Sequence, residues 1–219
     1  MKRSALLAVL LALAGCGSSG TSDYSQFYQA LRQSAAASFG NGHITKDQAA
    51  AIPYASMGYR VNGGPEQLVV LATDANGEQL WTSKAGIVIV TRGGRIVRTV
   101  GLANNVSAMT PGTGLQFPSP ADAAKGNITY MRSEDFPDFP TYGLPVTCTS
   151  FPRSVQTIVI LGQAISTLRI DDKCHSAEKN WSFTDSYWID PDSRLAWRTI
   201  QHISPEGPTV ETKILRPPG

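Results

Sequence analysis

Pairs of carboxylates are the groups in this 219-residue sequence whose spacing could support cleavage of a glycosidic bond. Such chemistry uses two carboxyl groups a few ångströms apart, one of them as a general acid. Three clusters hold two acids close in sequence: Asp135 with Asp138, Asp171 with Asp172, and Asp190 with Asp192. We expect all three in turns or at strand ends, where Asp commonly bonds to the backbone. A structural role is therefore favoured, and no catalytic residue is assigned.

Histidine-based nucleophilic catalysis needs a histidine that an acid holds against a nucleophile. His43 lies in a Gly/Asn-rich turn, His175 follows a cysteine, and His202 lies on an expected strand. No metal-ligand spacing joins the three, and Gly93-Gly94 before Arg95 is typical of a hairpin turn, not of a phosphate-binding loop. The sequence thus predicts a protein that is not an enzyme, with no metal site and no cofactor.

Cys16 stands at the end of an N-terminal signal. Lys2 and Arg3 precede an apolar run over 5–14, which is too short to span a bilayer and is typical of a cleaved secretory signal. Residues 13–16 (Leu-Ala-Gly-Cys) resemble the lipobox of bacterial lipoproteins, so we expect removal of 1–15, lipidation of Cys16 with acyl chains such as palmitate, and a flexible tether over 16–22. The alternative is an ordinary signal peptide with a chance cysteine. Gly17 occupies the position where Asp retains enterobacterial lipoproteins in the inner membrane, which favours the outer membrane.

Cys148 and Cys174 are the other two cysteines, and an even pair in an oxidising compartment predicts a disulfide. A metal site that includes His175, or a reactive thiol, is the alternative. Loss of Lys2 and Arg3 with the signal leaves 17 basic and 17 acidic side chains, scattered among one another. A nucleic-acid partner is therefore not expected.

The elements that would position these groups follow from periodicity. Residues 23–40 have the pattern of an amphipathic helix, and a short helical turn is predicted from Thr45, with Gln48 in a capping box and an end before Pro53. From Tyr54 onward, apolar and polar residues alternate with a period of two, and residues typical of turns are frequent. The predicted strands are 54–61, 67–73, 79–84, 87–92, 95–102, 127–131, 146–151, 155–161, 165–171, 181–189, 196–203 and 210–215.

Twelve short strands with little helix predict an all-β domain over 23–219. A sheet this wide has to curl or split. We expect a large antiparallel meander sheet folded on itself into a partly open barrel, with the short N-terminal helix packed against it or across its mouth. Residues 103–126, which contain at most one helical turn around 121–124, would join its two halves. The alternative is two separate sandwiches joined at 103–126.

Aromatic and polar side chains on these strands are candidates for binding a glycan or a partner protein. Sugars stack their apolar C–H faces on flat side chains that polar groups flank. The candidates are Trp81, Arg95, Arg98, Tyr187, Trp188, Trp197 and Gln201. The alternative is that these tryptophans, and Trp181, fill the core.

Several sequence blocks are distinctive as a set: Ile-Pro-Tyr-Ala-Ser-Met over 52–57, Trp81, Gly-Arg-Ile-Val-Arg-Thr over 94–99 with Gly-Leu at 101–102, and Tyr-Trp-Ile-Asp over 187–190 with Trp197 and Gln201. Together they resemble the YjbF/GfcB family of outer-membrane lipoproteins, which are encoded with exopolysaccharide and group-four capsule secretion genes. The chain departs from the family pattern in carrying Gly93 and the pair Cys148 and Cys174.

The resemblance implies a periplasm-facing accessory protein of polysaccharide export, anchored in the outer membrane through Cys16. Its partners would be the polysaccharide or other secretion proteins. No reaction follows from the family name. A non-enzymatic binding or scaffolding role is the first hypothesis, a carrier of a hydrophobic ligand in a β cup the second, and a glycan-modifying enzyme the third.

Overall fold

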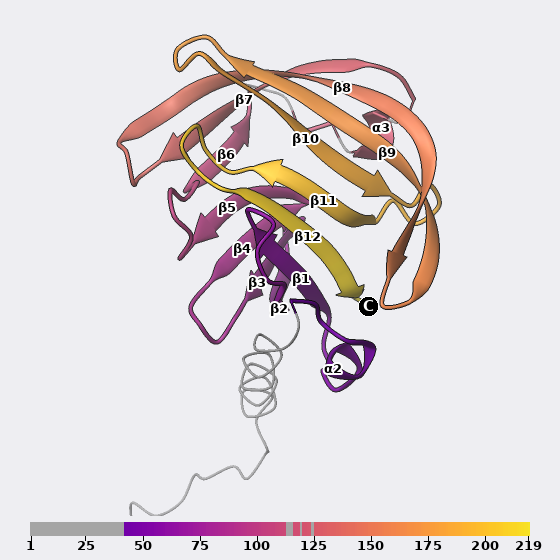
Figure 1. Cartoon of the computed structure of the whole chain (residues 1–219). Coiled ribbons are helices and arrows are strands. Elements are labelled where there is room, and N and C mark those ends of the chain that lie inside the picture. Colours follow the sequence, from indigo (N-terminus) through magenta and orange to yellow (C-terminus); the bar gives the residue numbers. More distant parts are fainter. Residues whose placement is uncertain (1–41, 113–115, 119, 124) are drawn as a thin grey trace, which may run out of the picture.

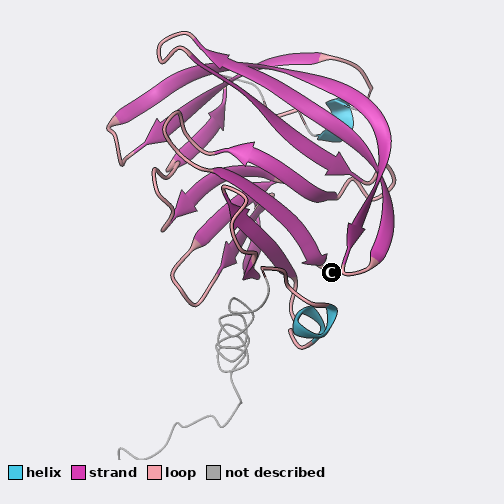
Figure 2. Cartoon of the chain, in the orientation of Figure 1, coloured by secondary structure: helices cyan, strands magenta, loops and turns pink. Residues whose placement is uncertain are grey.

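The computed structural model describes residues 42–112, 116–118, 120–123 and 125–219. Within them, twelve strands form one antiparallel sheet, and two short helices are the other regular elements (Figure 2). The predicted signal peptide, Cys16, the tether and the predicted helix over 23–40 all lie outside the described residues.

Two meanders make up the sheet. The first comprises β1 (Ser56–Val61), β2 (Gln67–Ala75), β3 (Glu78–Thr82), β4 (Val88–Arg92) and β5 (Arg95–Val100). The second comprises β6 (Ala108–Pro111), β7 (Ile128–Phe136), β8 (Thr141–Ile160), β9 (Gln163–Ser176), β10 (Trp181–Ile189), β11 (Ala196–His202) and β12 (Thr209–Arg216).

Pairing of β1 with β12 joins the two meanders, so the strand order runs from β5 back to β1 and then from β12 back to β6. The outermost strands, β5 and β6, come close together: the Thr99 N–H donates to the Val106 carbonyl at 2.8 Å. The sheet is therefore rolled into a nearly closed barrel (Figure 1). The predicted antiparallel meander is confirmed, and the alternative of two separate sandwiches is wrong.

The short helices agree with the sequence prediction. Helix α2 (Lys46–Ala50) begins with the predicted capping box, in which the Gln48 N–H donates to Thr45 Oγ1 at 3.2 Å and the Thr45 N–H to Gln48 Oε1 at 2.8 Å. Its buried Ala49 packs with Ile52 and Leu68 beside β2. Helix α3 (Pro120–Ala123) occupies the predicted turn between the halves.

The strand predictions fail at β6 and β8, and β7 and β9 continue beyond their predicted ends at residues 131 and 171, to Phe136 and Ser176. β8 is one strand of 20 residues, where two strands over 146–151 and 155–161 were predicted. Pro152 interrupts the sequence pattern, but it lies where the register with β9 shifts, and such an irregularity tolerates proline. β6 was not predicted, because it has four residues and ends at Pro111.

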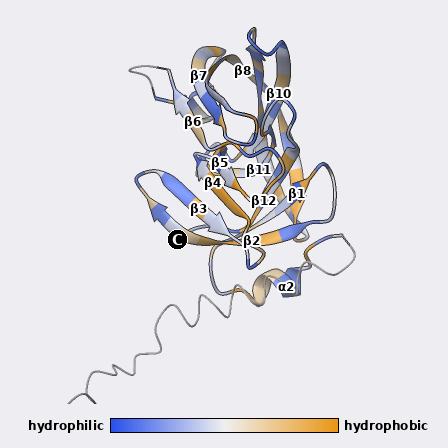
Figure 3. Cartoon of the chain, turned by 90° about the vertical axis from the view of Figure 1, so that its left-hand side faces the viewer, coloured by the Kyte–Doolittle hydropathy of each residue, from blue (hydrophilic) through white to orange (hydrophobic). Residues whose placement is uncertain are grey.

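The core fills the inside of the barrel, as the alternation of side chains along each strand requires. Figure 3 shows mostly hydrophobic residues along β4, and hydrophilic ones toward the turn that joins β2 and β3. The largest buried apolar side chains come from both meanders, and include Met57, Tyr59, Trp81, Ile89 and Phe136. Trp181 stacks on Phe183 with ring centroids 3.9 Å apart.

The predicted disulfide is present. Cys148 on β8 and Cys174 on β9 are directly paired across the two strands, with Cα atoms 4.0 Å apart. Both side chains are buried in the barrel core.

Gly94 offers a test of how the β4–β5 turn packs. At φ +81°, a Cβ on Gly94 would lie 2.5 Å from Ala196 Cβ, whereas a Cβ on Gly77, at φ +76°, would meet nothing within 4 Å. Both alanine substitutions incur the left-handed backbone penalty, but only Gly94→Ala also overpacks the turn against β11. We expect Gly94→Ala to lower the free energy of unfolding by about 1–3 kcal/mol more than Gly77→Ala. Urea titration of both variants measures this, and equal losses would contradict the packing.

Candidate functional site

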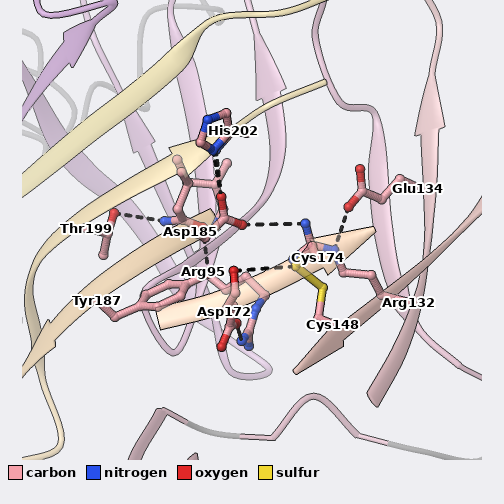
Figure 4. A network of polar contacts seen from close by, with 12 residues as sticks. Arg95, Arg132, Glu134, Cys148, Asp172, Cys174, Asp185, Tyr187, Thr199 and His202 are labelled. Atoms are coloured by element: carbon pink, nitrogen blue, oxygen red, sulfur yellow. Dashed lines mark hydrogen bonds and ion pairs between the residues drawn. A yellow bond between two sulfur atoms is a disulfide. The ribbon is translucent and has the colours of Figure 1, made fainter. Parts of the chain in front are cut away.

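Several charged side chains are buried inside the barrel, and Figure 4 shows the polar contacts that link them. Alternation along β7 points Tyr130, Arg132 and Glu134 inward, and their neighbours outward. Asp172 on β9 and Asp185 on β10 are directly paired across those strands, so they occupy the same inner face. Arg95 reaches this interior from β5, and the group forms two charged centres.

The first centre is an ion pair between Arg95 and Asp172. Arg95 Nη2 lies 2.7 Å from Asp172 Oδ2, and the side chains are 2% and 1% exposed. The Tyr130 hydroxyl donates to the same carboxylate oxygen at 2.7 Å, and the Ser150 hydroxyl donates to the other. The Arg95 guanidinium also lies 5.4 Å from the ring centroid of Tyr187. Each oxygen of the buried carboxylate therefore has a hydrogen-bond donor.

The pKa values of this centre favour the charged pair. Burial raises the pKa of Asp172, but the Arg95 guanidinium and the hydrogen bonds from Ser150 and Tyr130 outweigh burial, and the pKa lies below its ordinary value. Burial also disfavours the charged form of Arg95 and by itself lowers its pKa. The neighbouring Tyr130, Tyr187 and Asp172 outweigh burial, so the pKa of Arg95 lies above its ordinary value. Both groups are thus ionised at neutral pH.

The second centre links Arg132 to two carboxylates. Arg132 Nε donates to Glu134 Oε1 at 2.5 Å, and Arg132 Nη2 lies 3.5 Å from Asp185 Oδ2. Asp185 Oδ1 accepts from the backbone N–H of His202 at 2.8 Å and lies 3.2 Å from its Nδ1. Burial raises the pKa of Glu134, and the nearby Asp185 adds to this against the opposing effect of Arg132.

Gln201 connects the two sides of the barrel. Its Oε1 accepts from the Ile96 N–H at 2.9 Å and from the Tyr187 hydroxyl at 3.3 Å. Its Nε2 donates to the Gly94 carbonyl at 2.9 Å and to Thr199 Oγ1 at 2.8 Å. Every polar group of this amide is used inside the barrel, so Gln201 ties β11 to β5.

The seven predicted binding residues fall in different places. Arg95, Tyr187 and Gln201 come together in the interior, as described above. Trp81 is also interior and unexposed, with its Nε1 donating to Thr91 Oγ1 at 3.0 Å. Arg98 is exposed on β5. Trp188 and Trp197 lie on the outer side of the sheet, so the structure does not gather the seven residues into one surface.

On that outer side, the end of the β8–β9 hairpin folds back over the sheet. Ile158 and Ile160 of β8 pack with Trp188 of β10, and Leu215 and the partly buried Trp197 join the cluster. The Trp188 Nε1 donates to Gln156 Oε1 at 2.8 Å. These two tryptophans therefore mark the place where the hairpin meets the barrel wall.

The acidic clusters behave partly as predicted. Asp190 accepts the N–H groups of Asp192 and Ser193, which is the expected turn role. The expectation for Asp171 and Asp172 is wrong, because β9 continues to Ser176 and places both residues within the strand. Asp172 points inward to Arg95, whereas Asp171 contacts Arg153 and Arg169 on the outer side. These two acids therefore do not converge on a substrate.

Sequence reasoning missed four interior residues: Tyr130, Arg132, Glu134 and Asp185. The alternation of Tyr130, Arg132 and Glu134 was a usable signal. It was missed because the predicted strand ended at residue 131, which left the charged positions in an apparent loop. Since Arg132, Glu134 and Asp185 are at most 2% exposed, a substrate has no contact with them in this structure. The arrangement binds the strands to one another.

Comparisons with known proteins agree on one family. A family model described as "Group 4 capsule polysaccharide lipoprotein gfcB, YjbF" matches residues 32–215. The uncharacterized lipoprotein YjbF of Escherichia coli (strain K12) is 24% identical, over 99% of this chain and 98% of its own length. The uncharacterized lipoprotein GfcB of the same strain is 25% identical, over 94% of each chain.

The crystal structure of the hypothetical lipoprotein YmcC from Escherichia coli (K12) has the same fold. It superposes with a TM-score of 0.71 at 22% identity, covering 92% of this chain and 99% of YmcC. None of the described helices is long and apolar enough to cross a membrane.

Proposed function

The chain belongs to the YjbF family of group 4 capsule polysaccharide lipoproteins, and from that membership we propose that it is a lipid-anchored, periplasm-facing accessory protein of exopolysaccharide or capsule export. Its role is to bind or scaffold and not to catalyse a reaction. We place the anchor at Cys16 and, because Gly17 follows it, in the outer membrane. The partners that we propose are the polysaccharide itself or neighbouring secretion proteins.

The buried, paired state of the interior acids is the observation that supports a non-catalytic role. A general acid has to touch the bond that it protonates. Asp172 and Glu134 are instead closed off by protein and held by Arg95 and Arg132. This favours a rigid barrel that presents its outer surface to a partner.

The same observation weighs against the carrier hypothesis. A cup for a hydrophobic ligand needs an apolar cavity with few polar groups. Here ion pairs and the amide of Gln201 cross the interior, and Trp81 and Phe136 are buried among them. The carrier role therefore ranks below the scaffold.

Deletion of the gene tests the role in export. We expect less polysaccharide at the cell surface and more within the envelope, because secretion lacks an accessory component. The chain length of the polymer should stay the same, since no glycosidic bond is made or broken. Gel electrophoresis of surface and periplasmic fractions measures both quantities. Unchanged amounts would contradict the export role, and a changed chain length would favour an enzyme.

A further inference from the structure

The end of the β8–β9 hairpin leaves one strand edge unpaired. β7 accompanies β8 only as far as the pair of Ile128 with Ser150. Beyond the register shift, residues 155–160 of β8 pair with β9 on one side, and no other described strand pairs with them. Backbone N–H and C=O groups on that edge are therefore available to a ligand.

A cleft of about 380 Å³ lies beside this edge. One wall is formed by residues 156–160 of β8, and the other by Trp188, Arg198 and Lys213 of the barrel wall. Two cations and no carboxylate line the cleft. Its size is within the usual range for small-molecule sites.

Arg198 is held in position for recognition. Its guanidinium lies 4.4 Å from the ring centroid of Trp188, and its Nε donates to Glu211 Oε1 at 2.8 Å. The bond to Glu211 uses Nε, so it leaves the N–H groups of Nη1 and Nη2 for other partners. Arg198 is 30% exposed, so a ligand can reach these groups. A planar fork of this kind matches a carboxylate in two parallel hydrogen bonds.

Lys213 adds a second positive charge on the same wall. Its Nζ lies 3.5 Å from Glu211 and 3.6 Å from Glu66, and its side chain is 22% exposed. Glu66 is also shared with Arg60, at 3.8 Å. Three cations therefore share two carboxylates, and the charge left over is positive.

We propose that this cleft binds an acidic oligosaccharide segment, with Arg198 and Lys213 on a uronic-acid carboxylate and the β8 edge on the sugar hydroxyls. The inference rests on the proposed role in export, and it names the class of glycan and the binding site. An added peptide strand fits less well, because it needs pockets for alternate side chains. Ile158, Ile160 and Trp188 pack against one another, are at most 8% exposed, and offer no such pockets.

Calorimetric titration of the mature lipoprotein in detergent tests the site, with tetragalacturonic acid as the probe. Maltotetraose serves as the neutral sugar and tetraglutamate as the acidic peptide. The variant is Arg198→Gln with Lys213→Gln, and the control is Arg92→Gln, because Arg92 forms a similarly exposed ion pair with Glu78 on β3, away from the cleft. Thermal unfolding checks that both variants fold.

Wild type and the Arg92→Gln control should bind the acidic sugar with a Kd in the millimolar range or tighter. The double variant should bind about tenfold or more weakly, because it loses charge-assisted hydrogen bonds. Maltotetraose and tetraglutamate should bind far less well. Absence of binding by wild type, equal binding by the double variant, or equal binding of tetraglutamate would overturn the site. Surface polysaccharide in the deletion strain is measured independently, so failure of the site and failure of the export role are distinguishable.

Discussion

Asp172→Ala should lower the free energy of unfolding by about 3–5 kcal/mol, because it leaves the buried Arg95 guanidinium without its counter-charge. Arg95 is 2% exposed and cannot reach water to compensate. The matched control is Asp171→Ala, one residue away on the opposite face. Its charged partners Arg153 and Arg169 are 42% and 34% exposed and stay solvated, and the Ser186 hydroxyl loses one hydrogen bond, so a smaller loss of about 1 kcal/mol is expected. Chemical denaturation at pH 7 compares the two, and similar losses would contradict the buried ion pair.

The stability lost in Asp172→Ala should depend on pH, which is a second test of the buried ion pair. Because the pKa of Asp172 is lowered on folding, its stabilisation is present above the unfolded value of about 3.9 and is lost as the pH falls through the folded value. The stability difference between wild type and Asp172→Ala should therefore shrink when the pH is lowered below about 4. A difference that stays constant at acid pH would mean that Asp172 acts through packing and not through its charge.

Removal of the disulfide should have the second largest effect. Cys148 and Cys174 are 26 residues apart in sequence, and their bond closes the β8–β9 hairpin within the core. We expect the double variant Cys148→Ala with Cys174→Ala to lose about 2–5 kcal/mol, mainly through the greater freedom of the unfolded chain. Urea unfolding with and without a thiol reductant measures this.

The reductant provides the control for that experiment. It should destabilise the wild type to a similar degree and leave the double variant unchanged. Two reactive thiols in unreduced, denatured wild type would contradict the bond.

Local sequence signals predicted the fold well where an element depends on its own residues. Thr45 and Gln48 fix the start of α2 between them, and β10 was predicted with its observed bounds, Trp181–Ile189. The failures come from tertiary context. β6 has four residues and forms by pairing with β7, and β8 continues past Pro152, where β9 pairs with it on one side.

The interior site was less predictable than the fold, since it depends on contacts between distant residues. Arg95 and Asp172 are 77 residues apart, and Gln201 and Ile96 are 105 apart. Alternation can show which residues share a face, but not which strands lie opposite each other in a rolled sheet. The disulfide was predictable because the count of cysteines and the predicted secretory signal limit the possibilities.

Complementation of the deletion strain tests the proposed function most directly. Surface polysaccharide is quantified in cells that express wild type or Cys16→Ala, with both proteins checked for equal abundance. We predict that wild type restores surface polysaccharide, and that the variant, which cannot carry the proposed lipid at position 16, restores little. Surface polysaccharide at the normal level in the deletion strain itself would contradict a role in export.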